Sequence, residues 1–88
     1  MKNLKELLNN LEAAEKAANE ANDALDLENP TEEAEQAFDV AYKKEWEAFE
    51  ELTKALEEVT GGKIDTKTAS QMIRGRREDL KRIINLYQ

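Results

Sequence analysis

The stretch "VTGGKIDT", residues 59–66, decides how this chain folds. Gly61 and Gly62 supply the left-handed backbone that ends a helix, so a helix arriving from the N-terminal side is expected to stop here. Asp65 or Thr66 can then cap a further helix, because a side-chain oxygen at this position accepts the free amides of a first turn. The stretch therefore separates a long N-terminal part from a C-terminal helix.

A second break, "ENPTEE" at residues 28–33, divides the N-terminal part. Asn29 can cap the helix that follows, Pro30 suits its first position, and Glu32 can reach back as in a capping box. The two breaks together predict helices at about residues 3–27, 30–60 and 66–87.

Each predicted helix has an apolar face. In the first, apolar residues recur at heptad spacing, and their side chains become smaller along the helix as leucine gives way to alanine. These residues are Leu4, Leu7, Leu8, Leu11, Ala14, Ala18, Ala21 and Leu25. The second has Ala34, Phe38, Ala41, Tyr42, Phe49, Leu52, Leu56 and Val59, with Trp46 at the edge. The third has Ala69, Met72, Ile73, Leu80, Ile83, Ile84 and Tyr87, and Gly75 interrupts it on its exposed side.

These patterns predict one all-α domain spanning residues 1–88. We expect a long antiparallel two-helix hairpin with the third helix packed across it, as a coiled-coil-like three-helix bundle. Charged residues make up 38% of the chain and hydrophobic residues 40%, which is typical of long helices. A chain of this length with so many alanines in its seams buries little area, so we expect a homodimer.

Several classes of function are disfavoured by composition. The chain has no histidine and no cysteine, and Ser70 is its one serine, so catalytic triads and histidine acid–base chemistry are excluded. No calcium loop, phosphate loop or helical di-metal pattern occurs, and we expect no enzyme activity, no metal and no cofactor. No run of roughly 18 apolar residues and no signal peptide is found, which predicts a soluble protein of the cytoplasm without membrane contact.

Charge is distributed unevenly along the chain. Residues 1–60 hold 17 acidic and 6 basic residues, a balance of −11, whereas residues 61–88 hold 3 acidic and 7 basic residues, a balance of +4. Such asymmetry bears on partners and on electrostatic steering rather than on fold.

The acidic surface is the larger candidate for partner binding. Carboxylates one helical turn apart are about 5–6 Å from each other at Cβ, which approaches phosphate spacing, so an acidic helix can occupy a groove built for nucleic acid. An ordinary solvated helix face is the other interpretation. The candidate residues are Glu12, Glu15, Asp23, Asp26, Glu47, Glu50, Glu51, Glu57 and Glu58.

The third helix presents an alternative basic face of Lys67, Arg74, Arg77 and Lys81. It can contact phosphates, or it can pair with the acidic hairpin of its own chain. No aromatic residue stands among these cations to stack on a base, and the net charge of −7 repels a polyanion. We therefore expect no useful affinity for free DNA or RNA.

Two charges fall within the apolar faces. A helical wheel places Glu45 between Phe38 and Leu52, and Arg76 in the middle of the third helix's apolar face. Because isolated charges are not buried, the two are predicted to form a buried ion pair, or the arginine stem lies over the core with its charged head in water. The other interpretation is that one or both face a partner.

Residues 41–84, "AYKKEWEAFEELTKALEEVTGGKIDTKTASQMIRGRREDLKRII", resemble small acidic helical early proteins of phages and mobile elements of Gram-positive bacteria. The aromatic-acidic helix, the "GGKIDTKTA" junction and the basic-apolar final helix carry this likeness. Such proteins often resemble inhibitors of host defence, including anti-CRISPR proteins. The resemblance implies a stoichiometric protein inhibitor and assigns no individual binding residue.

The function expected from the sequence is that of a phage-type anti-defence protein. It would bind an effector with a basic nucleic-acid groove, a CRISPR nuclease foremost, through its acidic helix faces. Two alternatives remain open, a structural or assembly coiled-coil protein and a nucleic-acid binder acting through the basic third helix.

Overall fold

The computed structural model describes residues 3–25, 29 and 31–87. Within these residues it contains no strand and four helices, α1 (Leu4–Ala24), α2 (Glu32–Val59), α3 (Thr66–Gly75) and α4 (Arg77–Tyr87). The prediction of an all-α protein is confirmed for this part of the chain.

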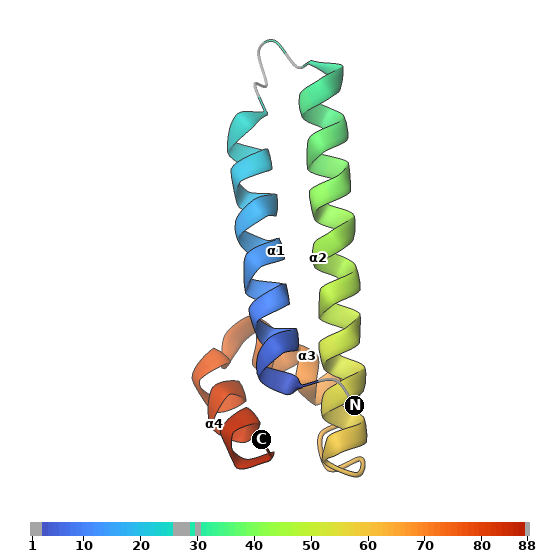
Figure 1. Ribbon diagram of the computed structural model, residues 1–88, viewed down its shortest axis with the longest axis vertical. Coiled ribbons are helices and arrows are strands. Elements are labelled where there is room, and N and C mark those ends of the chain that lie inside the picture. The colour runs from blue at the N-terminus through green and yellow to red at the C-terminus, as the bar shows by residue number, and fades with distance from the viewer. Residues whose placement is uncertain (1–2, 26–28, 30, 88) are drawn as a thin grey trace.

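The two long helices form an antiparallel pair, and the two short helices gather at one end of it. Figure 1 shows α1 and α2 side by side, with α3 and α4 at the end of the pair where α1 begins and α2 finishes. The molecule measures 48 × 24 × 19 Å along its principal axes. It is therefore a rod that is thick at one end and narrow at the other.

The start of α2 differs from the prediction. Thr31, and not Asn29, is the cap: its backbone is extended and its hydroxyl accepts the amide of Ala34 at 3.1 Å. The helix consequently begins at Glu32, and Pro30 lies outside the described residues. The first helix also ends earlier than predicted, at Ala24, because Leu25 already has extended backbone angles.

The glycine pair ends α2 as predicted. Gly61 and Gly62 have φ angles of 64° and 87°. The Gly62 amide donates to the carbonyl of Glu57 at 2.9 Å and the Gly61 amide to that of Glu58 at 3.2 Å, which is the Schellman arrangement. Thr60 completes the turn, since its buried hydroxyl donates to the Leu56 carbonyl at 2.7 Å.

The predicted third helix is two helices. The backbone of Arg76 leaves helical geometry, with φ −135° and ψ 55°, so that α3 ends at Gly75 and α4 begins at Arg77. Glycine is the physical cause we assign, because its lack of a side chain makes a helix interior easy to break. Residues 75–77 are called the elbow below.

The hydrophobic core is confined to the thick end of the rod. It joins the first half of α1 to the last turns of α2 and to both short helices, through Leu4, Leu7, Leu8, Leu11, Leu52, Leu56, Ile64, Ala69, Met72, Ile73, Leu80 and Ile84. Among the described residues between 12 and 51, Ala18 alone is buried. We call this narrow part, residues 12–25 and 32–48, the upper hairpin.

Asp65 caps α3, and its titration gives a pH test of that cap. The Asp65 carboxylate accepts the Thr68 amide at 2.7 Å, and this bond holds the pKa of Asp65 below its ordinary value of 3.8. A carboxylate with a depressed pKa stabilises the folded state above its unfolded pKa, and this stabilisation is lost as the pH falls through the folded pKa.

The variant Asp65→Asn is accordingly expected to melt close to the wild type at neutral pH, because asparagine is also a good cap. Below about pH 4 the wild-type melting temperature should fall more steeply than that of the variant. Melting curves between about pH 6 and pH 2 measure the difference. Parallel curves would show that the carboxylate charge contributes nothing.

Candidate binding groove

A groove of about 320 Å³ lies where the middle of α2 meets α1 and the elbow. Its walls combine aromatic, acidic and basic side chains, namely Glu15, Tyr42, Glu45, Trp46, Phe49, Ile73, Arg74 and Arg77. The groove sits directly above the hydrophobic core, since Ile73 is a core residue and Phe49 packs against the core. It is the best-formed hollow that combines rings with charges among the described residues.

A row of aromatic side chains on α2 forms one wall. Phe38 stacks on Tyr42 with ring centroids 6.0 Å apart, and the edge of Trp46 meets Phe49 at 5.4 Å. These four residues, at spacings of three and four, share one face of the helix. The row runs from the groove up the upper hairpin, where Tyr42 is 52% exposed and Trp46 is 46% exposed.

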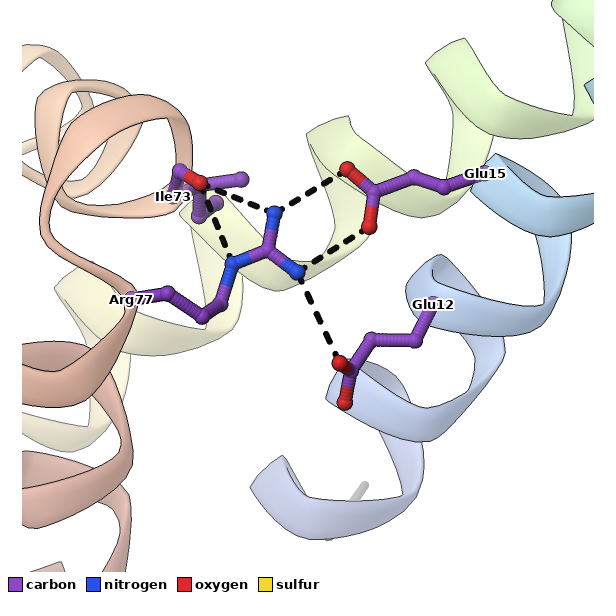
Figure 2. A network of polar contacts seen from close by, with 4 residues as sticks. All are labelled: Glu12, Glu15, Ile73 and Arg77. Atoms are coloured by element: carbon purple, nitrogen blue, oxygen red, sulfur yellow. Dashed lines mark hydrogen bonds and ion pairs between the residues drawn. The ribbon is translucent and has the colours of Figure 1, made fainter. Parts of the chain in front are cut away.

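Arg77 also lines the groove, and Figure 2 shows its polar contacts. Its Nη1 and Nη2 donate to the two carboxylate oxygens of Glu15, both at 3.0 Å, and Nη1 lies 3.7 Å from a carboxylate oxygen of Glu12. Its Nε and Nη2 also donate to the Ile73 carbonyl, at 3.1 and 2.9 Å. One guanidinium thus ties the end of α3 to α1.

The electrostatics of this contact follow from its geometry. The hydrogen bonds that Arg77 donates to Glu15 raise the pKa of Arg77 above its ordinary value, although partial burial opposes this, and the charges of Glu15 and Glu12 add to the rise. Arg77 is therefore a fixed cation whose charge is balanced within the chain.

Arg74 and Glu45 face the same groove in different ways. The guanidinium carbon of Arg74 lies 5.5 Å from the centre of the Phe49 ring, a cation–π contact. Glu45 is half-buried and lines the groove, yet its carboxylate makes no hydrogen bond or ion pair with any described residue. The groove therefore contains a carboxylate without a counter-ion.

The predicted buried ion pair of Glu45 with Arg76 is wrong. Arg76 is exposed and lines a different hollow, with Met72, Asp79, Arg82 and Ile83. The wheel assumed one continuous helix, and the break at the elbow turns Arg76 away from the apolar face. Its neighbour Arg77 takes the inward position instead.

The predicted acidic face is divided by the structure. Glu12 and Glu15 are half-buried and bind Arg77, so they do not form a free surface. Asp26 lies outside the described residues. The remaining predicted carboxylates are exposed, and they are Asp23 on α1 and Glu47, Glu50, Glu51, Glu57 and Glu58 on α2.

The predicted basic face is also divided. Lys67 and Lys81 are exposed, and Arg74 is exposed while it rests on Phe49. Arg77 was expected among them and is instead held in the groove wall by carboxylates of its own chain. A continuous basic stripe on one helix therefore does not form.

The sequence pattern did not identify the groove. Tyr42 is predicted as a core residue and Trp46 as a core edge, but both are largely exposed. Alanines on the facing helix, at Ala14, Ala18 and Ala21, were the available signal, because side chains this small leave a neighbouring aromatic row partly uncovered. The groove is also lined by Arg77 of the elbow, and the heptad pattern does not reveal the elbow.

No described helix has both the length and the apolar character required to cross a membrane. Within the same residues, no three acidic side chains gather closely enough to hold a metal ion. No protein-family model, curated protein or solved structure matches the chain.

Proposed function

We propose that this protein is a stoichiometric inhibitor of the anti-defence type, which binds a nucleic-acid-handling effector through the acidic surface of α2. The observation that carries the proposal is the row of exposed carboxylates on a rigid helix. Glu47, Glu50, Glu57 and Glu58 are exposed, and their carboxylates make no hydrogen bond or ion pair with described residues.

These exposed carboxylates are unfavourable for the protein in the absence of a partner. A surplus of unpaired carboxylates repels itself and so disfavours the compact state. A partner with a basic groove relieves this repulsion, and complementary charge also accelerates encounter. Because α2 spans 28 residues without a break, it presents its carboxylates in a fixed order, as a nucleic-acid strand presents phosphates.

These carboxylates lie away from the core-facing side of α2, so they can be substituted to test binding without disturbing folding. The core lies on the side of α2 that carries Leu52 and Leu56, and the four glutamates lie elsewhere on that helix. Substitution there leaves the core contacts intact. The resemblance to phage early proteins supports a CRISPR nuclease as the effector, and the effector's bound DNA would be excluded.

Binding of free nucleic acid through α3 and α4 is the weaker alternative. Arg77 is occupied by Glu15, and the chain keeps a net charge of −7. Few cations remain to release counterions from DNA, so this interaction contributes little.

The test is a competition assay with the effector, its DNA target and increasing amounts of this protein. The triple reversal Glu47→Lys, Glu50→Lys and Glu58→Lys is expected to raise the concentration needed for inhibition by about tenfold or more. Wild-type inhibition should weaken as ionic strength rises, because exposed charges are screened beyond about 8–10 Å at physiological salt.

A matched reversal supplies the control. Glu6→Lys, Glu20→Lys and Glu78→Lys change the net charge by the same amount at exposed positions outside α2, and they should inhibit nearly as well as the wild type. Circular dichroism of both triple variants verifies that helix content is kept. Equal loss of inhibition in the two triple variants would show that net charge alone causes the effect. Full inhibition by the α2 variant would refute the proposed surface.

A further inference from the structure

The groove contains two guanidinium groups of its own chain, each in a recognisable setting. Arg77 makes two parallel hydrogen bonds to the carboxylate of Glu15. Arg74 lies over the ring of Phe49 at 5.5 Å. Carboxylate and aromatic face are the two surfaces that best accept a planar guanidinium, so the walls of this groove are suited to arginine.

A third setting of the same kind, at Glu45, has no partner among the described residues. Glu45 lines the groove without a hydrogen bond or ion pair to a described residue. It stands one helical turn from Tyr42 and Phe49 and next to Trp46 on α2. Tyr42 and Trp46 expose about half of their surfaces, which is unusual for large rings beside a core.

We propose that Glu45, Tyr42 and Trp46 bind an arginine side chain of the partner protein. The carboxylate of Glu45 accepts hydrogen bonds from the guanidinium, and the aromatic rings cover its faces. A lysine fits less well, because its compact and strongly hydrated ammonium neither stacks on a ring nor binds a carboxylate through two parallel bonds. That the partner is a protein with a basic surface rests on the function proposed above.

Charge complementarity selects this occupant over a second copy of the chain. The four charged residues of the groove are two glutamates and two arginines, and Glu45 is the one without an ion pair or cation–π contact. A second copy brings a net charge of −7 against a chain of the same charge. An arginine-bearing basic surface instead meets an acidic rod with an unpaired carboxylate at its groove.

Trp46 is the only tryptophan of the chain, so its fluorescence reports directly on the groove. The probe is arginine blocked at both ends, as the N-acetyl amide, titrated at constant ionic strength into the full chain. We expect a saturable change of Trp46 emission with a dissociation constant in the millimolar range. The corresponding blocked lysine should bind at least about threefold more weakly.

The variant Glu45→Gln keeps the size of the side chain and removes its charge, and it should weaken the binding of blocked arginine about tenfold. The matched control is Glu47→Gln, since Glu47 is an exposed neighbour on α2 that does not line the groove, and its titration should equal that of the wild type. Arg74→Gln should bind at least as tightly, because it removes a cation that lines the groove and that contacts a ring and no carboxylate of a described residue.

Three outcomes would overturn the inference. They are a wild-type titration without saturation, equal binding by Glu45→Gln, and a concentration-dependent Trp46 change without ligand that coincides with dimer mass in light scattering. The inference and the proposed function fail separately. If blocked arginine binds as expected but the protein inhibits no effector, the proposed function is wrong and the arginine site stands. If blocked arginine does not bind, and Glu45→Gln inhibits the effector as well as the wild type does, the arginine site is wrong and the proposed function stands.

Discussion

Replacement of Leu56 by alanine is expected to lower the free energy of unfolding by about 2–5 kcal/mol. Leu56 is fully buried in the core formed by all four helices. Its loss leaves a cavity in a domain whose total stability is expected to be about 5–15 kcal/mol, and at the low end of this range for so short a chain. Urea unfolding followed by circular dichroism measures the difference, and the variant should unfold at a much lower midpoint.

Tyr42→Ala is the matched comparison, because it removes a larger side chain from the same helix. Tyr42 is 52% exposed and lies in the upper hairpin, outside the core. Its truncation should cost no more than about 1 kcal/mol, the range of substitutions that create no cavity. If the two variants were equally destabilised, the core would extend along the whole hairpin and the aromatic row would be structural.

The local signals of the sequence are sufficient to predict α1, α2 and the start of α3, but not the division between α3 and α4. The glycine pair at residues 61–62 acts through its backbone amides, and the cap at Asp65 acts through its side-chain carboxylate on the amide of Thr68, so neither effect depends on distant parts of the chain. The same holds for the leucines of α1, whose spacing defines a buried face. The predicted ends of α1 and α2 differ from the structure by one to three residues, and the difference at the start of α2 arises because Thr31 is the cap in place of Asn29.

The groove could not be predicted in the same way. A helical wheel drawn through Gly75 assumes that one helix continues unbroken, whereas the backbone leaves helical geometry at Arg76. The assignments of Arg76 and Arg77 change there, because Arg76 is exposed and Arg77 is half-buried, whereas the apolar residues on either side of the elbow keep their buried positions. The contact of Arg77 with Glu15 spans 62 positions of the sequence, and no local pattern encodes it.

The thick end and the upper hairpin differ in how much apolar surface they bury. The thick end supplies stability through leucine and isoleucine packing. The upper hairpin and the α2 surface hold exposed rings and carboxylates that contribute little to folding. Under the proposed function this exposed surface is the part that meets a partner, and the contact of Arg77 with Glu15 joins α3 and α4 to α1 at the boundary between the two parts.

Replacement of Arg77 by leucine is expected to lower the free energy of unfolding by about 1.5–3 kcal/mol, the cost of losing hydrogen bonds to charged groups. The substitution removes both bonds to Glu15 and leaves the Ile73 carbonyl without the two donors that it has from this side chain. The side chains of Arg77 and Glu15 are 28% and 30% exposed, so water compensates part of the loss. Thermal and urea unfolding measure it.

Arg82→Leu is the matched control on α4. The ion pair of Arg82 with Asp79 spans 3.8 Å between side chains that are 80% and 49% exposed, and such a surface pair contributes about 0–1 kcal/mol. A double-mutant cycle of Arg77→Leu with Glu15→Gln then isolates the specific contact. We expect a coupling free energy of about 1–2 kcal/mol, because the two bonds are parallel and charge-assisted. Additive effects would show that Arg77 acts through Ile73 alone, and that α1 is positioned against α3 by apolar packing without this contact.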